Sequence, residues 1–308
     1  MRRTWMLAAV VSVALVAGAC GSDKKSTSSG TATTQAARTF APGSTMARIK
    51  AAGSIKVGVK FDQPGFGQKN PSTGQVEGFD VEIAKLIVKA IGDNVKIDFV
   101  ESVSKNREPF LQNGTVDMVV ATYTINDTRK QVVDFAGPYF VARQDIMVKS
   151  DDTTIKSVTD LNGKNVCTVK GSTSEKNVRA KAPTANVTLF DTYSQCAEAL
   201  KDGRVIAETT DNTILAGLVQ QSSGAFKLVG APFSDEPYGI GVKKGDDEFR
   251  TFVNDRLDEI VQSGAWAKAF EATLGKIGLA TPEPPKVNRY TGTPPAPTTA
   301  APTTTTAR

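Results

Sequence analysis

The sequence of 308 residues contains no histidine, only three cysteines and two tryptophans. Without histidine the chain cannot form Ser-His or Cys-His nucleophilic sites, and it lacks the side chain that most often transfers protons near neutral pH. Histidine is also the commonest metal ligand. The absence excludes the commonest nucleophilic enzyme classes, and we expect no metal site and no cofactor.

The first 19 residues combine a basic start at Arg2 and Arg3 with an uncharged run from Trp5 to Ala19. That run is shorter than the ~20 residues that span a bilayer, and it ends in small residues, so it predicts a secretory signal peptide. Cys20 follows directly. The junction resembles the lipobox of bacterial lipoproteins, in which the cysteine is lipidated; a plain signal peptide is the alternative.

The other two cysteines, Cys167 and Cys196, form an even pair in a chain predicted to be exported. Such a pair favours a disulfide, which would stabilise the fold by about 3 kcal/mol. Two separate buried thiols are the alternative.

Both ends of the chain have compositions that cannot build a core. Residues 20–45 are rich in Ser, Thr, Ala and Gly and predict a flexible tether, and residues 281–308 predict a disordered Pro/Thr/Ala tail. The leader and these two ends carry eight of the 37 basic residues but two of the 32 acidic ones, which leaves residues 46–280 at a net charge of −1. The overall charge of +5 is therefore no argument for nucleic-acid binding.

Strands and helices alternate through the part between these ends, which predicts a largely parallel sheet with helices on both faces. The pattern repeats, so we expect two α/β units joined by crossings near 141–149 and 236–243. The expected strands are 55–59, 95–99, 116–120, 141–149, 165–169, 187–190, 205–207 and 238–242. The expected helices are 46–52, 83–91, 107–111, 194–200, 214–219, 246–262 and 265–273, with a loop at 61–67.

The stretch from Ala121 to Arg129 suggests a carboxylate site. The apolar strand before it is expected to end where Thr122 and Thr124 begin, and a loop marked by Asn126 and Asp127 follows. Two hydroxyls and the planar donor fork of an arginine suit the two oxygens of a carboxylate. A polar turn with a solvated arginine is the alternative.

The second unit repeats this arrangement with different residues. Ser172 or Thr173 is placed to cap a helix whose free N–H groups would face an anion. Asp211 follows another strand at its carboxyl end, where ligands of such sheets bind. Lys60 and Arg107 also fall near strand ends.

Several motifs together resemble the extracellular solute-binding proteins for polar amino acids, family 3, and most of all the glutamate-binding lipoproteins of Gram-positive ABC uptake systems. The similarity covers residues 46–276 and implies a two-lobed, type II periplasmic-binding-protein-like α/β fold with two doubly wound sheets. It rests on Gly78-Phe-Asp-Val-Glu-Ile83, Lys60-Phe-Asp-Gln-Pro-Gly65, Gln112-Asn-Gly-Thr-Val-Asp-Met118, Ala121-Thr-Tyr-Thr-Ile-Asn126, Thr209-Thr-Asp-Asn-Thr-Ile-Leu215 and Tyr238-Gly-Ile-Gly241.

The resemblance implies roles for the residues that match. Arg129 stands where the family grips the α-carboxylate of the ligand, and Asp211 matches the acid that receives the α-ammonium. Lys60 and Arg107 fall where binders of acidic amino acids hold the side-chain carboxylate, although a surface lysine and a helix-face arginine are the alternatives. Phe61 would pack on the ligand stem or belong to the core. The rest of the implied set is Thr122, Thr124, Ser172, Thr173 and Tyr238.

The resemblance also implies a function. We expect a monomeric lipoprotein, anchored outside the cell membrane through Cys20, that binds glutamate, aspartate, glutamine or asparagine and delivers it to an ABC permease and its ATPase. A sensory receptor is one alternative; a dehydratase using Glu175 or Asp211 as acid or base is another. The expected divisions are 1–19 signal, 20–45 tether, 46–143 and 238–280 first lobe, 144–237 second lobe, and 281–308 tail.

Overall fold

The computed structural model describes residues 38–290, so the predicted signal peptide, the lipidation site at Cys20 and most of the tether lie outside the described residues. Among the helices described, none is long and apolar enough to span a bilayer. The strands are β1 (Ser54–Val59), β2 (Asp62–Gln63), β3 (Gly67–Lys69), β4 (Val76–Glu77), β5 (Lys96–Glu101), β6 (Met118–Thr124), β7 (Val133–Lys149), β8 (Asn165–Val169), β9 (Asn186–Phe190), β10 (Ala207–Asp211), β11 (Phe226–Leu228) and β12 (Ser234–Lys243).

Helices alternate with these strands, as the sequence predicts. The α-helices are α1 (Thr45–Ala52), α2 (Phe79–Lys89), α3 (Arg107–Gln112), α4 (Asp127–Lys130), α5 (Thr173–Lys181), α6 (Tyr193–Lys201), α7 (Asn212–Gln221), α8 (Asp247–Gln262) and α9 (Ala265–Ala272), with short 3-10 helices at Ser104–Asn106, Val158–Leu161 and Leu274–Ile277.

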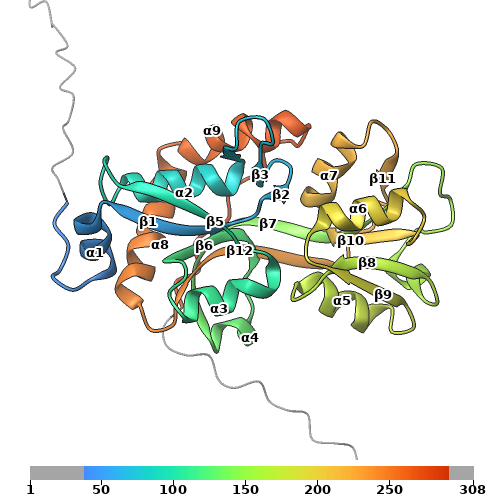
Figure 1. Ribbon diagram of the computed structural model, residues 1–308, viewed down its shortest axis with the longest axis horizontal. Coiled ribbons are helices and arrows are strands. Elements are labelled where there is room, and N and C mark those ends of the chain that lie inside the picture. The colour runs from blue at the N-terminus through green and yellow to red at the C-terminus, as the bar shows by residue number, and fades with distance from the viewer. Residues whose placement is uncertain (1–37, 291–308) are drawn as a thin grey trace, which may run out of the picture. The chain divides into compact units, whose positions relative to one another are not determined.

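The main sheet is shared by two lobes. Its strand order is β5-β1-β6-β12-β7-β10-β8-β9, and β11 pairs with β7. Strands β5, β1 and β6 are parallel, as are β9, β8 and β10. The long strands β7 and β12 run antiparallel to each other and to the neighbours on either side, so they belong to both groups. This is the predicted two-lobed arrangement with two crossing strands (Figure 1).

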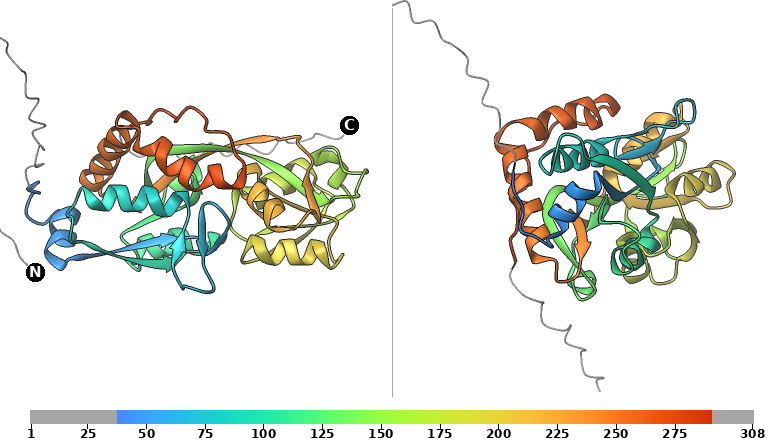
Figure 2. Two further views of the ribbon diagram at one scale, coloured as in Figure 1. Left: turned by 90° about the horizontal axis from the view of Figure 1, so that it is seen from above. Right: turned by 60° about the vertical axis from the view of Figure 1, so that its left-hand side comes forward.

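The first lobe consists of β1, β5 and β6 with α1–α4, α8 and α9, and its strand β6 is buried on both faces. Met118 and Val120 pack in the cluster that α2, α8 and α9 contribute to, while Val119, Ala121 and Tyr123 pack in a second cluster with α3. Successive side chains of a strand point to opposite faces of the sheet, which explains why these residues alternate between the two clusters. Figure 2 shows α2 beside α8 and α9. Because both faces of β6 are covered, its sequence is a continuous apolar run rather than an alternating one.

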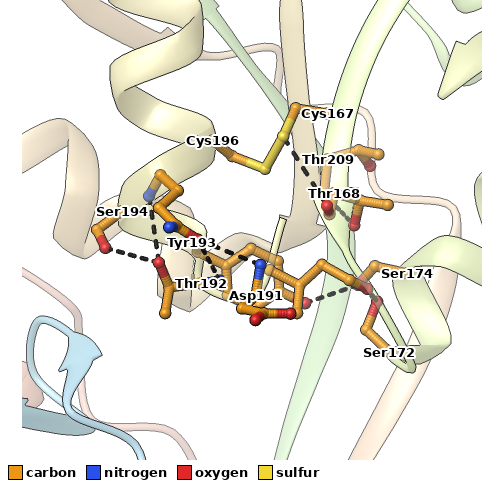
Figure 3. Close-up of a disulfide and its surroundings, with 12 residues drawn as sticks. Cys167, Thr168, Ser172, Ser174, Asp191, Thr192, Tyr193, Ser194, Cys196 and Thr209 are labelled. Carbon is orange, nitrogen blue, oxygen red and sulfur yellow. Dashed lines mark hydrogen bonds between the residues drawn. A yellow bond between two sulfur atoms is a disulfide. The ribbon is translucent and has the colours of Figure 1, made fainter. Parts of the chain in front are cut away.

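The second lobe consists of β8–β11 with α5–α7 and is covered in the same way. Val166 and Val178 pack in a cluster on the α5 side. Cys167 and Cys196 belong to the opposite face and form a disulfide that ties β8 to α6 (Figure 3). The predicted disulfide is thus present, and the separate-thiol alternative is wrong.

Four expectations about local structure are wrong. Strand β6 does not end before Thr122 but runs through Thr124. The predicted loop at Asn126 and Asp127 is instead the start of the one-turn helix α4, which Asn126 caps and which contains Arg129. The expected loop at 61–67 contains the hairpin strand β2 and the first residue of β3, and the expected strand at 205–207 begins only at Ala207. In the strands β2, β6 and β10, pairing with neighbouring strands overrides a local signal from polar or turn-forming residues, whereas α4 follows from local capping by Asn126.

The predicted tether and tail are also shorter than expected. Phe40 packs edge-on against Phe252 at 5.6 Å between ring centroids, so the tether is already part of the fold before Thr45. At the other end, the Tyr290 hydroxyl donates to Asp134 at 3.1 Å and accepts from the Phe135 N–H at 2.8 Å. Disorder is therefore the wrong expectation for residues 281–290, whose polar contacts the composition does not reveal.

Candidate functional site

The carboxyl end of β6 is held in an unusual backbone conformation. Thr122 has a φ of 44°, which is an outlier for a β-branched side chain. Its N–H donates to Asp80 Oδ2 at 2.9 Å, and the Tyr139 hydroxyl donates to Asp80 Oδ1 at 2.6 Å. The Thr122 hydroxyl donates to Gln63 Oε1 at 3.0 Å. Strain that surrounding contacts hold in place is typical of a binding site.

Asp80 performs this positioning from the first turn of α2. It is fully buried, and burial raises the pKa of its carboxyl to about 7, while hydrogen bonds from Tyr139 and from the N–H of Thr122 act in the opposite direction. Asp80 thus does more than place a favourable negative charge at a helix N-terminus: it fixes the end of β6.

Arg129 is buried beside this strand end. Its guanidinium donates to the Thr124 carbonyl at 2.7 Å, to Glu108 Oε1 at 3.2 Å and, across to the second lobe, to the Gly171 carbonyl at 3.3 Å. It also lies 4.9 Å from the centre of the Tyr123 ring. Burial and the neighbouring Arg107 lower the pKa of Arg129 from its ordinary value. The side chain is only 8% exposed, so the alternative of a solvated arginine is wrong.

The N-terminus of α5 faces this arginine from the second lobe. Ser172 caps the helix by accepting from the Glu175 N–H at 3.0 Å, and its own hydroxyl donates to the Val169 carbonyl at 2.6 Å. The Thr173 and Thr124 hydroxyls lie 3.4 Å apart, which joins the two lobes. Figure 3 shows Ser172 at the start of this helix.

Asp211 ends β10 and is buried. The Tyr238 hydroxyl donates to its Oδ2 at 2.6 Å, whereas its Oδ1 has no hydrogen-bond partner among the residues described. Burial raises the pKa of Asp211 to about 7 and the negative charge of Glu236 adds to the effect, while the Tyr238 bond, Arg107 and Arg129 oppose it. Asp211 is also the N-cap residue of α7, yet its side chain makes no capping bond.

Strand β12 joins the two halves of this arrangement. Tyr238 pairs with Thr124 in the sheet register while its hydroxyl contacts Asp211. Glu236, two residues earlier, accepts from the Thr124 hydroxyl at 2.8 Å and from Asn177 of α5 at 2.9 Å. Arg129 and Asp211 therefore border one junction between the lobes: Arg129 donates to the Thr124 carbonyl, and Tyr238, the sheet partner of Thr124, donates to Asp211.

The two remaining predicted cations are buried in the first lobe. Lys60 donates to the Ser104 hydroxyl at 2.9 Å, and burial together with Arg107 lowers its pKa to about 7. Arg107 donates to the carbonyls of Ser104, Ala121 and Thr122 at 3.1–3.2 Å. Both residues are 2% exposed, so the alternative of a surface lysine is wrong, whereas Arg107 does lie in a helix, α3. Arg107 supports the end of β6, and its role as a ligand for a carboxylate stays a prediction.

Phe61 lies at the edge of the first lobe's core. It is half-buried against the main cluster, and Lys69 Nζ lies 5.4 Å from the centre of its ring. The structure thus supports the core alternative for Phe61. Packing against a ligand stem stays a prediction.

Further contacts cross between the lobes around this junction. Lys105 Nζ lies 2.6 Å from Asp191 Oδ1, and the Tyr193 N–H donates to Asp62 Oδ2 at 2.8 Å.

The candidate dehydratase acid Glu175 is engaged, because its carboxylate accepts from the Gly171 N–H at 3.0 Å and pairs with Arg179. An open pocket of about 530 Å³, lined in part by Gln68 and Lys276, has none of the predicted ligand residues in its lining.

Sequence reasoning missed three residues at this junction: Gln63, Thr213 and Glu236. Gln63 and Thr213 lie within motifs that carry the resemblance, but nothing in those motifs marks them as site residues, and Glu236 lies in no such motif. Their placement depends on contacts between elements far apart in the chain, such as the bond from Thr122 to Gln63.

Comparison with known proteins gives one consistent picture. The family model of the bacterial extracellular solute-binding proteins, family 3, matches residues 55–276. The ABC transporter glutamine-binding protein GlnH of Bacillus subtilis (strain 168) is 47% identical over 229 residues, which are 74% of this chain and 83% of that protein. The glutamate-binding protein GluB of Corynebacterium glutamicum is 41% identical over 75% of this chain and 82% of its own length.

Solved structures agree with this. An ancestral arginine-binding protein bound to glutamine has a TM-score of 0.69 at 41% identity, covering 72% of this chain and 98% of that structure. An ancestral amino-acid-binding protein that is a precursor of cyclohexadienyl dehydratase has a TM-score of 0.68 at 33% identity, covering 75% of this chain and 99% of that structure.

Proposed function

The chain belongs to the bacterial extracellular solute-binding proteins of family 3, and on this premise we propose that it binds a polar α-amino acid, glutamate or glutamine first, for uptake by an ABC transporter. Aspartate and asparagine are the smaller members of the same ligand class.

One observation carries the proposal. A buried guanidinium on the first lobe and a buried carboxyl on the second meet at the same junction, and the carboxyl keeps one oxygen, Asp211 Oδ1, without a partner among the residues described. In an α-amino acid, the carboxylate and the ammonium are both bonded to the same carbon, Cα. The ammonium would donate to Asp211, and the carboxylate would lie against Arg129 and the hydroxyls of Thr124 and Thr173.

Burial strengthens this arrangement. Charges that interact away from water are screened less than charges at the surface. The α-ammonium would also favour the ionised form of Asp211, because an opposite charge nearby lowers a carboxyl pKa. Ser172 and Tyr238 act indirectly in this proposal: Ser172 caps α5, and Tyr238 holds the second oxygen of Asp211.

The side chain of the ligand would extend toward Lys60. The ammonium of Lys60 is buried just after β1 and donates to the Ser104 hydroxyl, so it would be free to pair with a carboxylate of the ligand. Glutamate would place its second carboxylate there. Arg107 would act indirectly, by donating to the carbonyls of Ala121 and Thr122 and so holding the end of β6 in place.

The rest of the proposal concerns delivery. The lobes, with the divisions expected from the sequence, would turn about β7 and β12, and the ligand would select the closed state that the permease and ATPase recognise. A lipid on Cys20 would keep the monomeric protein at the outer face of the membrane. The proposal includes no enzymatic step: Glu175 is engaged in capping contacts, and the close relatives named above are binding proteins.

Titration calorimetry of the mature chain with glutamate, glutamine, aspartate and asparagine tests the proposal. We expect at least one of these amino acids to bind with one ligand per chain, and we expect no binding of glutarate, which lacks the ammonium. Absence of binding by all four amino acids would contradict the proposal, as would equal affinity for glutarate and glutamate.

A further inference from the structure

Several buried polar atoms in and around the proposed ligand site have no hydrogen-bond partner within the described part of the chain. Among them are Gln63 Nε2, Asp211 Oδ1 and Thr213 Oγ1, whose residues are at least 92% buried, and the hydroxyl of Tyr123, whose ring lies beside Arg129. Buried donors and acceptors are nearly always paired, because an unpaired one loses its hydrogen bonds to water without replacement. The ammonium of the ligand accounts for Asp211, and of the others Gln63 and Thr213 are the pair whose positions relate the two lobes to each other.

Gln63 and Thr213 lie on surfaces that face each other. A Cβ added to Gly217 in α7 would lie 2.6 Å from the Pro64 carbonyl oxygen, so the helix and the turn after β2 are in direct contact. Thr213 lies four residues before Gly217 and therefore on the same face of α7. Gln63 is the residue next to Pro64. The two unpaired side chains thus border the contact between β2 of the first lobe and the first turns of α7 in the second.

Both side chains lie next to residues already placed at the site. The Thr122 hydroxyl donates to Gln63 Oε1 at 3.0 Å, which leaves Nε2 as the free end of the amide. Thr213 lies two residues after Asp211, in the first turn of the helix that Asp211 begins. The Gln63 amide is therefore fixed on the Thr122 side, and the Thr213 hydroxyl is close to the acid that would receive the ammonium.

We propose that Gln63 and Thr213 bind the polar end of the ligand's side chain and that they recognise the feature a carboxylate and a carboxamide share, a carbonyl oxygen. This inference rests on the proposed function and adds two ligand-binding residues to it. The Gln63 amide donates to the side-chain oxygen. The Thr213 hydroxyl donates to an oxygen or accepts from an amide N–H, because a hydroxyl does both.

The chemistry of the two groups explains a site that accepts both glutamate and glutamine. Neither Gln63 nor Thr213 carries a charge, so neither penalises the neutral ligand. A buried donor left unpaired by a ligand that lacks the oxygen would discriminate strongly against that ligand. The site should therefore separate glutamate and glutamine together from norvaline, which has the same head group and chain length but ends in a methyl group.

Calorimetry with glutamate, glutamine and norvaline on the wild type and on Gln63→Leu and Thr213→Val tests this. Loss of one hydrogen bond to each polar ligand predicts about tenfold weaker glutamate and glutamine binding in Gln63→Leu, with norvaline changed less than about twofold. Thr213→Val should show the same pattern with a smaller loss, about threefold to tenfold. Gln220→Leu, which changes an exposed glutamine of the same helix α7, is the control and should bind all three ligands as the wild type does.

The outcomes separate the two proposals. If Gln63→Leu and Thr213→Val leave glutamate and glutamine binding unchanged, or weaken norvaline as much as the polar ligands, the inference is wrong while the proposed function stands. If the wild type binds none of the four amino acids of the class, the proposed function fails first. Melting temperatures within a few degrees of the wild type show that a loss of affinity is not a loss of folding.

Discussion

The two lobes hold their charged site residues in opposite ways. On the first lobe, Arg107 and Arg129 both donate to backbone carbonyls at the end of β6. Arg129 also donates to the carboxylate of Glu108 and to the Gly171 carbonyl. On the second lobe, the described part of the chain offers Asp211 a partner for one of its two oxygens, the Tyr238 hydroxyl. The cations are thus fixed by the protein itself, whereas the acid keeps an open position.

This difference suggests how the work of binding is divided. The first lobe is preorganised, because its guanidinium groups keep their places without a ligand and need no reordering on binding. The second lobe contributes an acceptor that only an incoming ammonium satisfies. Recognition of the carboxylate and recognition of the ammonium would then respond differently to mutation and to pH, and each prediction below addresses one side of this comparison.

The largest effect is expected on the first lobe, from Arg129→Ala. Removing one partner of a buried charge pair costs about 2–5 kcal/mol, so binding of every amino acid should weaken at least about 30-fold. Calorimetry with glutamate and glutamine measures this. Arg143→Ala, which removes an exposed arginine paired with Asp235, is the matched control and should bind normally. A loss confined to glutamate would assign Arg129 to the side chain instead.

On the second lobe, Asp211→Asn keeps the shape of the side chain and removes the charge that the ammonium requires. We expect glutamate and glutamine to bind about 10- to 100-fold more weakly, since a hydrogen bond to a charged group contributes about 1.5–3 kcal/mol. Glutarate, which we expect not to bind the wild type, provides one contrast, because removing the Asp211 charge should not weaken and can only improve its binding. The melting temperature provides the other: a fall in step with the loss of affinity would show that Asp211 acts on structure alone.

The pH dependence should differ between the lobes. Burial raises the pKa of Asp211 to about 7, so its carboxylate form, and with it the affinity for glutamine, increases between pH 6 and 8. Burial lowers the pKa of Lys60 to about 7, so its ammonium form, and with it the ratio of glutamate to glutamine affinity, decreases over the same range. One group titrating across this window gives at most about a tenfold change. A constant ratio would contradict the role of Lys60.

The smallest effect on binding is expected from the disulfide, which the second lobe alone possesses. Cys167 and Cys196 are separated by 29 residues, and closing such a loop stabilises a fold by about 3–4 kcal/mol. Replacing both by alanine should lower the free energy of unfolding in urea by that amount and change the glutamate affinity by less than about threefold. A large loss of affinity at unchanged stability would mean that the disulfide shapes the site directly.

The sequence predicted the parts of this molecule that depend on local pattern. Strands such as β1 and β8 show their periodicity in the residues themselves, and the disulfide follows from an even pair of cysteines. The backbone of Thr122 at φ 44°, by contrast, depends on Asp80 from α2. Gln63 lies in a segment that reads as a loop because of Pro64 and Gly65. The packing of Tyr290 on Asp134 joins residues 156 positions apart, which no local pattern reports.

The candidate site divides in the same way. The sequence shows that Arg129 and Asp211 fall near the carboxyl ends of strands, and the resemblance to the solute-binding family implies their roles toward a zwitterion. The engagement of Arg107 with three backbone carbonyls was not foreseen, because the sequence does not show which donors the fold uses itself. Gln63 and Thr213 are identified only by their unpaired atoms, a property of the folded molecule.

A crystal structure of the protein grown with glutamine tests the central claim most directly. The account predicts that the α-ammonium lies within hydrogen-bond distance of Asp211 Oδ1 and that the α-carboxylate contacts the Arg129 guanidinium, with both lobes touching one ligand molecule. A ligand bound to one lobe only, or turned so that its ammonium points away from Asp211, would contradict it.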